Sequence, residues 1–486
     1  MNENHPKIGL ITFGDNRAHE WEHVFRRMTE PRHEAAVAFF GRLPVELVAH
    51  PTVARHKEEI DEQIDTLKAA GVEAFVAHTP CWTSPNLVVR GVQRLDRPTL
   101  MLTNRDPGTH GTVGFLGAAG TLDQIGYPHL RVRAEFDDAG AARMLEQALP
   151  FFRAAAARAR LRGLTFGLFG GRSLGIDTGT FDPLQWKQMF QVDTEHIDQL
   201  EIIRRAESVD PDQTAAMVAW LERSVARVDY GQGQLTPEKL AHQVRCYLAT
   251  KELIAEKGLD FVAVKCMPDL TTHYVPQCIS AALLPGPYDA DGVKEPIMMA
   301  CEADGDAALT MEMLKQVSGG KPVLFMDVSY IDDEARIFYM PNCGAFCSWY
   351  AKRSPDPAEN LRQVELRPAN RPGGGAITYF TTAPGPLTFA RLFRRAGHYH
   401  MTILTGETID LPAEDYAAFV AARGSHQLPT AFAKLHTDID RFLDQFASNH
   451  ILAVDGIYRN ELVHLCRMLG VEAEVLSPSP LNGVTP

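Results

Sequence analysis

The sequence predicts a mixed α/β protein in which two Rossmann-like domains, each a doubly wound parallel sheet, precede a β-rich C-terminal domain. Apolar runs bounded by Gly, Pro or Asp alternate with longer segments of helical period, as expected for parallel sheets covered by helices. A length of 486 residues is too great for one ordinary core. After about Tyr330 the strand-like segments are short and separated by Gly and Pro turns, which is typical of an antiparallel sheet or small barrel.

Residues 1–162 are predicted to form the first Rossmann-like domain. Helices such as Val53–Ala70 separate its strands, and an alanine- and arginine-rich helix around Ala139–Arg162 is predicted to lead into the second domain. The predicted strands are Lys7–Phe13, Val45–Ala49, Ala74–His78 and Thr99–Thr103.

Residues 163–318 are predicted to form the second Rossmann-like domain and residues 319–486 the β-rich domain, with Glu302 in the former and Asp327 and His450 in the latter. Two long helices, Asp212–Val228 and Pro237–Lys257, are expected between the second and third strands of the second unit. The next predicted strands are Leu164–Phe169, Phe190–Asp193, Phe261–Val264, Ile297–Cys301 and Val323–Asp327, the last of which lies beyond the domain boundary. The β-rich segments are Arg336–Met340, Ala376–Phe380, Leu387–Leu392, Tyr399–Leu404 and Ile451–Val454.

Composition restricts the possible partners. The formal net charge is −13, so no positive field favours nucleic acid or an anionic membrane. The 8 cysteines are scattered without a CxxC pair, as in a protein with reduced thiols. No run reaches the ~18 apolar residues that a membrane helix needs. These features predict a cytoplasmic protein.

Two carboxylates and one imidazole each stand at the edge of an apolar run: Glu302, Asp327 and His450. Loops at strand ends are where α/β proteins expose functional groups. The set therefore predicts a site for one hard divalent metal. Taken singly, Glu302 or Asp327 could be a helix cap or a surface charge, and His450 a hydrogen-bonded core histidine.

Three other motifs have weaker functional interpretations. Gly170–Gly175 follows a predicted strand, but its spacing is not GxGxxG, so a tight turn is favoured over the dinucleotide site of a reductase. His398 and His400 would lie on one face of a strand and could bind zinc, although such a pair is more often hydrated or at an interface. Trp82, after Pro80 and Cys81, would suit stacking on a sugar.

Several segments resemble, in order and spacing, the L-fucose isomerase family, which includes fucose and arabinose isomerases. The similarity is collinear over nearly the whole chain. The segments are Thr79–Trp82, Val293–Pro296 leading to Ala300–Asp304, Phe325–Val328, and Ser448–His450 followed by the helix Arg459–Leu469.

The resemblance implies an aldose–ketose isomerase with Mn²⁺ held by Glu302, Asp327 and His450. Oxygen-rich ligation with one imidazole suits Mn²⁺, with Mg²⁺, Co²⁺ or Fe²⁺ as possible substitutes. Moving a carbonyl between C1 and C2 requires removal of the C2 proton, which a divalent metal on the sugar oxygens makes possible. Glu302 and Asp327 are predicted to move the protons through a cis-enediol.

The resemblance also implies a homohexamer with active sites shared between subunits. Arg17 and Trp82 match positions at which a neighbouring subunit completes the sugar pocket. The alternatives are a surface ion pair for Arg17 and a half-buried packing ring for Trp82. Asn342 and Asn449 are also predicted to contact the sugar.

Departures from the family pattern concern the substrate. Val264–Pro268 replaces a glutamine-containing stretch, and His426 and Gln427 stand where a tryptophan is expected. If Lys265 faces the pocket, the substrate would be an anionic hexose, sulfonated or acidic, rather than a neutral sugar; as a surface charge it would have no such meaning. An alternative of another class is a sugar-binding or regulatory protein of the same fold without turnover.

Overall fold

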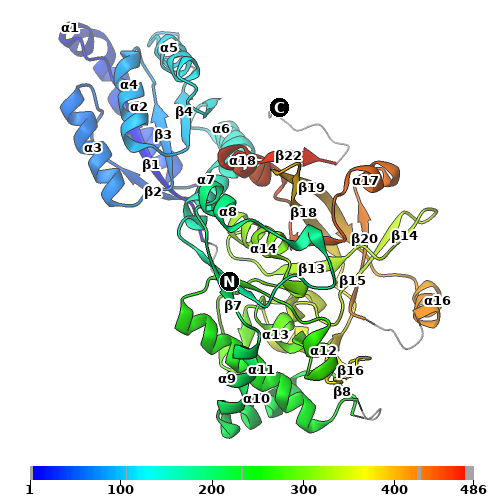
Figure 1. The fold of residues 1–486 in the computed structure, drawn as a ribbon. Helices are drawn as coiled ribbons and strands as arrows, with labels where there is room; N and C mark the ends of the chain where they lie inside the picture. The colour runs from blue at the N-terminus through cyan, green and yellow to red at the C-terminus, as the bar shows by residue number, and fades with distance from the viewer. Residues whose placement is uncertain (1–3, 106, 231–233, 424–427, 477–486) are drawn as a thin grey trace. The chain divides into compact units, whose positions relative to one another are not determined.

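The computed structural model describes residues 4–105, 107–230, 234–423 and 428–476. The chain divides into two compact units (Figure 1). One contains Glu3–Arg160 together with Asn460–Leu469, and the other contains Leu161–Arg459 and the segment that begins at Gly470. The three-domain division with boundaries after residues 162 and 318 stays a prediction.

The unit that contains the N-terminal region is built on a parallel sheet with the strand order β2-β1-β3-β4-β5. The four predicted strands are confirmed to within one residue at each end, and a fifth was not predicted. The strands are β1 (Lys7–Thr12), β2 (Glu46–Ala49), β3 (Ala74–His78), β4 (Thr99–Thr103) and β5 (His129–Arg133).

Helices cover both faces of this sheet because consecutive strand residues point to opposite sides. Ile11 and Phe75 belong to one buried cluster, while Leu10 and Val76 belong to another. The first cluster includes residues of α3 (Lys57–Ala69), α4 (Pro85–Leu95) and α5 (Gly111–Gln124), and the second includes residues of α2 (Arg26–Phe40), η2 (Met144–Ala148) and α7 (Leu149–Leu161). Helix α6 (Asp138–Arg143) precedes η2, and α18 (Arg459–Leu469) belongs mostly to this unit.

The other unit begins with a second parallel sheet, in the order β12-β9-β6-β7. Its strands are β6 (Thr165–Phe169), β7 (Asp193–Ile197), β9 (Phe261–Val264) and β12 (Met299–Ala300), and its long helices are α9 (Leu200–Ser208), α10 (Pro211–Ser224) and α11 (Pro237–Lys257). The strand predicted at Phe190–Asp193 exists but was misplaced: β7 begins at Asp193 and runs to Ile197. Phe190 ends helix α8 (Pro183–Met189), and its buried ring packs edge-on against Tyr399, so its apolar character reflects the end of a helix.

Most of the later strands of this unit form a largely antiparallel sheet, as predicted, with the order β13-β21-β18-β19-β20-β15-β14. The predicted strand Ala376–Phe380 lies outside it: β17 (Ala376–Tyr379) belongs to a separate three-stranded sheet with β16 (Glu365–Pro368) and β8 (Arg227–Val228). Strand β22 pairs parallel to β19. The segment Val323–Asp327 lies in the antiparallel sheet rather than the second parallel sheet, because it pairs antiparallel with β21. The strands are β13 (Val323–Asp327), β14 (Tyr330–Asp332), β15 (Ile337–Pro341), β18 (Gly385–Arg395), β19 (His398–Thr408), β20 (Thr430–Leu435), β21 (His450–Asp455) and β22 (Glu472–Val475).

Helix α14 (Gly305–Val317) joins these two sheets into one unit. It is almost entirely buried and packs against β9 of the parallel sheet and against β18 and β21 of the antiparallel sheet. The segment just before α14 is therefore held beside the ends of β13 and β21. Among the described helices, none combines the length and apolar character needed to cross a membrane.

Candidate active site

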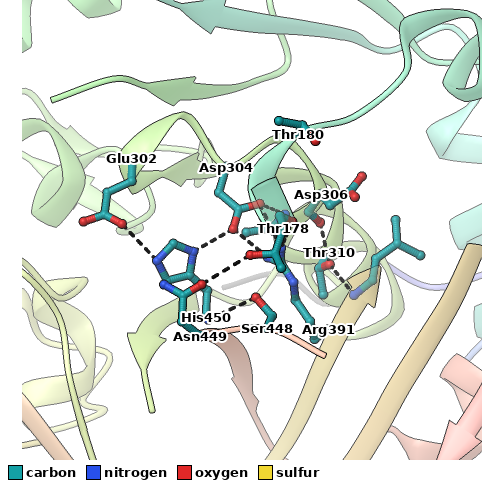
Figure 2. Close-up of polar contacts among 12 residues, drawn as sticks. Thr178, Thr180, Glu302, Asp304, Asp306, Thr310, Arg391, Ser448, Asn449 and His450 are labelled. Carbon is teal, nitrogen blue, oxygen red and sulfur yellow. Dashed lines mark hydrogen bonds and ion pairs between the residues drawn. The ribbon is translucent and has the colours of Figure 1, made fainter. Parts of the chain in front are cut away.

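Glu302 lies in a tight turn between β12 and α14. Its backbone has φ 57° and ψ 24°, and Ala303 has φ 56°, so two successive non-glycine residues adopt the left-handed conformation. Such strain costs free energy and persists only where the surroundings enforce it. Here the turn ends at Asp304, whose carboxylate caps α14 by accepting a hydrogen bond of 2.8 Å from the Ala307 backbone N–H. The capped helix fixes the turn, and the turn directs Glu302 toward His450 (Figure 2).

Asp327 and His450 are brought together by strand pairing. Asp327 is the last residue of β13, His450 is the first of β21, and the two are direct partners in the antiparallel register. His450 Nε2 lies 3.1 Å from Glu302 Oε2 and 3.4 Å from Asp327 Oδ1. The imidazole is fully buried, whereas the Asp327 side chain is 30% exposed. The structure thus brings the three predicted residues to one place, with Asp327 on its open side.

The other nitrogen of His450 is held by Asp304. Nδ1 lies 2.6 Å from Asp304 Oδ2, so the imidazole donates its Nδ1 hydrogen to this carboxylate (Figure 2). Arg391 makes two contacts with the same carboxylate, at 2.9 and 3.1 Å, and both of these side chains are fully buried. Arg391 also donates to the Thr178 carbonyl at 2.6 Å. A carboxylate behind an imidazole fixes its tautomer and orientation, so Nε2 is directed toward Glu302 and Asp327.

No role for Asp304 or Arg391 was predicted from the sequence. Asp304 was included in the segment Ala300–Asp304, but an aspartate before a helix already has an explanation as a cap. Its second function depends on residues 87 and 146 positions away. The one available signal was its position two residues after Glu302, on a strand-to-helix turn.

The electrostatics of this cluster suit a cation at Nε2. Burial alone would lower the pKa of His450, but hydrogen bonds with Asp304, Asp327 and Glu302 outweigh it and raise this pKa well above its usual value. Burial would also raise the pKa of Asp304, but the Arg391 charge and the His450 contact lower it instead. The carboxylates of Glu302 and Asp327 therefore both face His450 Nε2, and they favour a positive charge at this nitrogen. Glu302, Asp327 and His450 together offer an oxygen-rich donor set with one imidazole, of the kind that divalent cations prefer.

A further carboxylate lies one step along α14. Asp306 is buried, and its pKa is raised to about 7, mainly by burial. The Tyr399 hydroxyl donates a hydrogen bond of 2.9 Å to it, and the Trp186 indole N–H donates to that hydroxyl at 2.8 Å. Asp306 also interacts electrostatically with Asp304 and Arg391, which links this chain of contacts to the residues behind His450.

The two asparagines predicted to contact sugar lie in different surroundings. Asn449 precedes His450, its side-chain oxygen accepts a 3.3 Å hydrogen bond from Thr178, and its carbonyl accepts one of 2.9 Å from Val328 N (Figure 2). The buried Asn342 uses its side-chain oxygen to accept the Gly344 backbone N–H at 3.1 Å. Asn449 is therefore adjacent to the cluster, while the oxygen of Asn342 is engaged in its own turn.

Lys265 follows β9 directly, at the same edge of the sheet as the Glu302 turn, because β9 and β12 are parallel neighbours. Its Nζ lies 2.6 Å from the Asp269 carboxylate, and its side chain is 25% exposed. The Lys265 ammonium therefore forms a local ion pair with Asp269 at this end of the sheet. His426 and Gln427, which replace the expected tryptophan, lie outside the described residues.

Arg17 and Trp82 lie in the unit that contains the N-terminal region. The Arg17 guanidinium donates hydrogen bonds of 2.6 and 3.1 Å to the Asp15 carboxylate. It lies 5.8 Å from the centre of the Trp82 ring. The structure therefore brings these two predicted residues together. Arg17, at the surface, contacts the Trp82 ring and forms an ion pair with the buried Asp15. Their part in a sugar pocket stays a prediction.

A second group of potential metal ligands occurs in the described part of the chain. His400, Glu472 and Glu474 each offer one ligand atom, and these atoms lie within 4.8 Å of one another, so the group could hold a metal ion. The sequence analysis considered His400 as a partner of His398, but the structure groups it with two glutamates of β22.

Comparison with known proteins matches both ends of the chain to one family. The family profile for the first N-terminal domain of L-fucose isomerase matches residues 5–163, and the profile for its C-terminal domain matches residues 340–476. A sulfoquinovose isomerase of Alkalicoccus urumqiensis is 21% identical, with 76% of this chain and 78% of the relative covered. A sulfoquinovose isomerase of Priestia aryabhattai is 20% identical (88% and 91% covered), and an L-fucose isomerase of Haemophilus influenzae is 23% identical (86% and 84% covered).

These matches define the class of protein: an intramolecular oxidoreductase that isomerises a sugar. The chain belongs to the L-fucose isomerase family. The predicted family and enzyme class are thereby confirmed.

Proposed function

We propose that this enzyme interconverts an aldose and its ketose at the cluster of Glu302, Asp327 and His450, with a bound divalent cation, Mn²⁺. The observation that carries the proposal is the convergence of two carboxylates on the Nε2 atom of a buried imidazole whose Nδ1 is anchored by Asp304. A module that only binds sugar has no need of this arrangement.

Each residue has a defined part in the proposed reaction. One of the two carboxylates, Glu302 or Asp327, removes the proton from C2 of the aldose and returns it to C1, while the other carries the hydroxyl proton from O2 to O1. The intermediate between these transfers is a cis-enediol. When bound, the divalent cation supplies the charge stabilisation that makes the C2 proton acidic enough to remove. Asp304 and Arg391 hold His450 in place throughout.

The wider organisation follows from the family. We propose a cytoplasmic homohexamer in which Arg17 and Trp82 of one subunit close the pocket of a neighbour, with Asn342 and Asn449 contacting the sugar from the same chain as the cluster. Two Rossmann-like domains and a β-rich domain would form each subunit.

Removal of the metal tests this proposal. Extensive chelation should eliminate most of the conversion of aldose to ketose, and addition of Mn²⁺ should restore it, because without the cation the C2 proton is too weakly acidic. The measurement is ketose formation by chelated and reloaded enzyme, with metal content determined on each sample. Full turnover by a preparation verified as metal-free would contradict the proposal.

A second candidate function is isomerisation of an anionic hexose. Two of the relatives described above are named for sulfoquinovose, a sugar whose name denotes a sulfo group. Lys265 lies at the edge of the sheet that also carries Glu302, and only one carboxylate contact, with Asp269, would have to be exchanged for it to meet a negative group. Lys265 would then contact the end of the sugar remote from C1 and C2.

Replacing Lys265 by alanine tests the choice of substrate. A charge-assisted hydrogen bond contributes ~1.5–3 kcal/mol, so Lys265→Ala should raise KM for a sulfonated hexose by roughly tenfold to a hundredfold and change KM for the neutral parent little. Lys187→Ala is a suitable control, because Lys187 also pairs with an aspartate, at 2.9 Å, but is 61% exposed. A preference of the wild type for the neutral sugar, or equal losses on both sugars, would return the assignment to a neutral aldose such as L-fucose or D-arabinose.

A further inference from the structure

We propose that His400, Glu472 and Glu474 form a second metal site, which binds Zn²⁺ and ties the edge strand β22 to β19. This site shares no residue with the proposed catalytic cluster. Its existence does not depend on the proposed reaction.

The two strands place the three side chains on one face. Strands β19 and β22 are parallel, with His400 opposite Glu472 and Thr402 opposite Glu474. Because side chains two residues apart on a strand point to the same side, both glutamates of β22 reach toward the imidazole. His400 Nδ1 lies 2.9 Å from Glu474 Oε1 and 3.5 Å from Glu472 Oε2.

Within the described part of the chain, the imidazole nitrogen at the centre of this group lies near carboxylate oxygens without forming a well-aligned hydrogen bond. His400 is only 7% exposed, and its Nδ1 makes no hydrogen bond of acceptable geometry although two carboxylate oxygens lie near it. Buried polar atoms are normally satisfied, so an unsatisfied nitrogen facing two anionic oxygens requires an explanation. A cation bound by all three atoms would satisfy it. The stacked ring of Phe393, 5.4 Å from the imidazole centre, helps to keep the ring in this orientation.

The surrounding charges favour a divalent ion. The Arg395 guanidinium, which is 53% exposed, also contacts the Glu474 carboxylate. Its closer contact, at 2.5 Å, is with Glu474 Oε1, and the other, at 3.4 Å, is with Oε2, so metal binding through Oε1 requires Arg395 to shift its contact to Oε2. Two carboxylates against one guanidinium leave a net charge of about −1 for the cation to neutralise. The Glu472 side chain is 71% exposed, so it can rotate to complete the coordination.

The donor set selects among metals. One imidazole and two carboxylates are ligands of Zn²⁺, which binds more tightly to such sites than Mn²⁺ and commonly completes four-coordination with water. Strand β22 lies at an edge, where its described pairing is with β19. A bound ion would add a cross-link between these strands, and any ligand that binds only the folded state raises its stability.

Zinc binding by the full-length protein tests the proposal. Chelated wild type and variants would be dialysed against Zn²⁺, and bound zinc would be counted per chain. His400→Gln and Glu474→Gln should each bind one equivalent less than wild type and should lose the corresponding rise in Tm. His398→Gln, on the same strand and face but outside the group, should bind as much as wild type. Crystals soaked in Zn²⁺ should show an anomalous peak between β19 and β22.

Glu472→Gln tests the site even if the other variants fail to fold, because the Glu472 side chain is largely in solvent and its substitution should not disturb the fold. It should weaken zinc binding at this site by tenfold or more. Repeating the count in the Glu302→Gln background separates the two sites, because His400→Gln should still remove one equivalent there. The proposal would be overturned if Glu472→Gln bound zinc with the stoichiometry and affinity of the wild type, and if His400→Gln or Glu474→Gln, once shown to be folded, did the same.

Discussion

Glu302→Gln should lower kcat on the natural sugar by about 10³-fold or more and leave the fold intact. The substitution preserves the size of the side chain but removes a proton acceptor and an anionic metal ligand at once. It also replaces the carboxylate oxygen that lies 3.1 Å from His450 Nε2. The measurement is kcat at saturating Mn²⁺, with circular dichroism and Tm to verify the fold.

Glu295→Gln provides the matched control for this experiment. Glu295 is exposed and lies a few residues before β12, in the segment that leads to the Glu302 turn. Its substitution should leave kcat unchanged. Near-normal kcat in Glu302→Gln would remove Glu302 from the mechanism.

Asp304→Asn should affect both stability and metal binding. Asparagine can still cap α14, but the fully buried Arg391 loses the charge that lies 2.9 Å from it. Leaving one member of a buried pair uncompensated costs ~3–5 kcal/mol of unfolding free energy. The Nδ1 contact of His450 is weakened as well, and loss of such an outer partner lowers metal affinity about 10–100-fold. Urea unfolding and Mn²⁺ titration measure the two effects.

Two further variants separate these effects. Asp182→Asn changes another helix-capping aspartate, at the start of α8, and should change stability little. Adding Arg391→Met to Asp304→Asn removes the uncompensated charge, so stability should recover in part while metal affinity stays low. Recovery of both stability and metal affinity in the double variant would mean that Asp304 acts only through Arg391. Wild-type Mn²⁺ affinity in Asp304→Asn would show that Asp304 does not position His450 for metal binding.

Much of the fold could be predicted from local patterns. The strands Ala74–His78, Thr99–Thr103 and Phe261–Val264 and the helix Pro237–Lys257 have the predicted bounds, because apolar runs with clear breaks define buried strands and a threonine cap and a glycine end define the helix. Phe190 was misassigned because a buried aromatic residue at the end of a helix resembles the start of a strand.

The candidate site could be predicted only in its central residues, not in those that support them. Glu302, Asp327 and His450 stand at strand ends, and their resemblance to a known family grouped them correctly. Asp304 and Arg391 could not be predicted, because their pairing depends on how α14 packs against β18. The same is true of Glu472 and Glu474, since which strand pairs with β19 is a long-range property of the sheet.

The most direct measurement of the central claim is isomerisation in D₂O. Wild-type enzyme loaded with Mn²⁺ would be incubated with a panel of neutral aldoses and sulfonated or acidic hexoses, and the products followed by NMR. Proton transfer by carboxylates through a cis-enediol predicts that at least one aldose yields its ketose, with deuterium at C1 in the fraction of turnovers in which the carboxylate exchanges its proton with solvent before returning it. It also predicts that Glu302→Gln largely loses this conversion. Failure of the wild type to convert any aldose, or undiminished conversion by Glu302→Gln, would contradict the account.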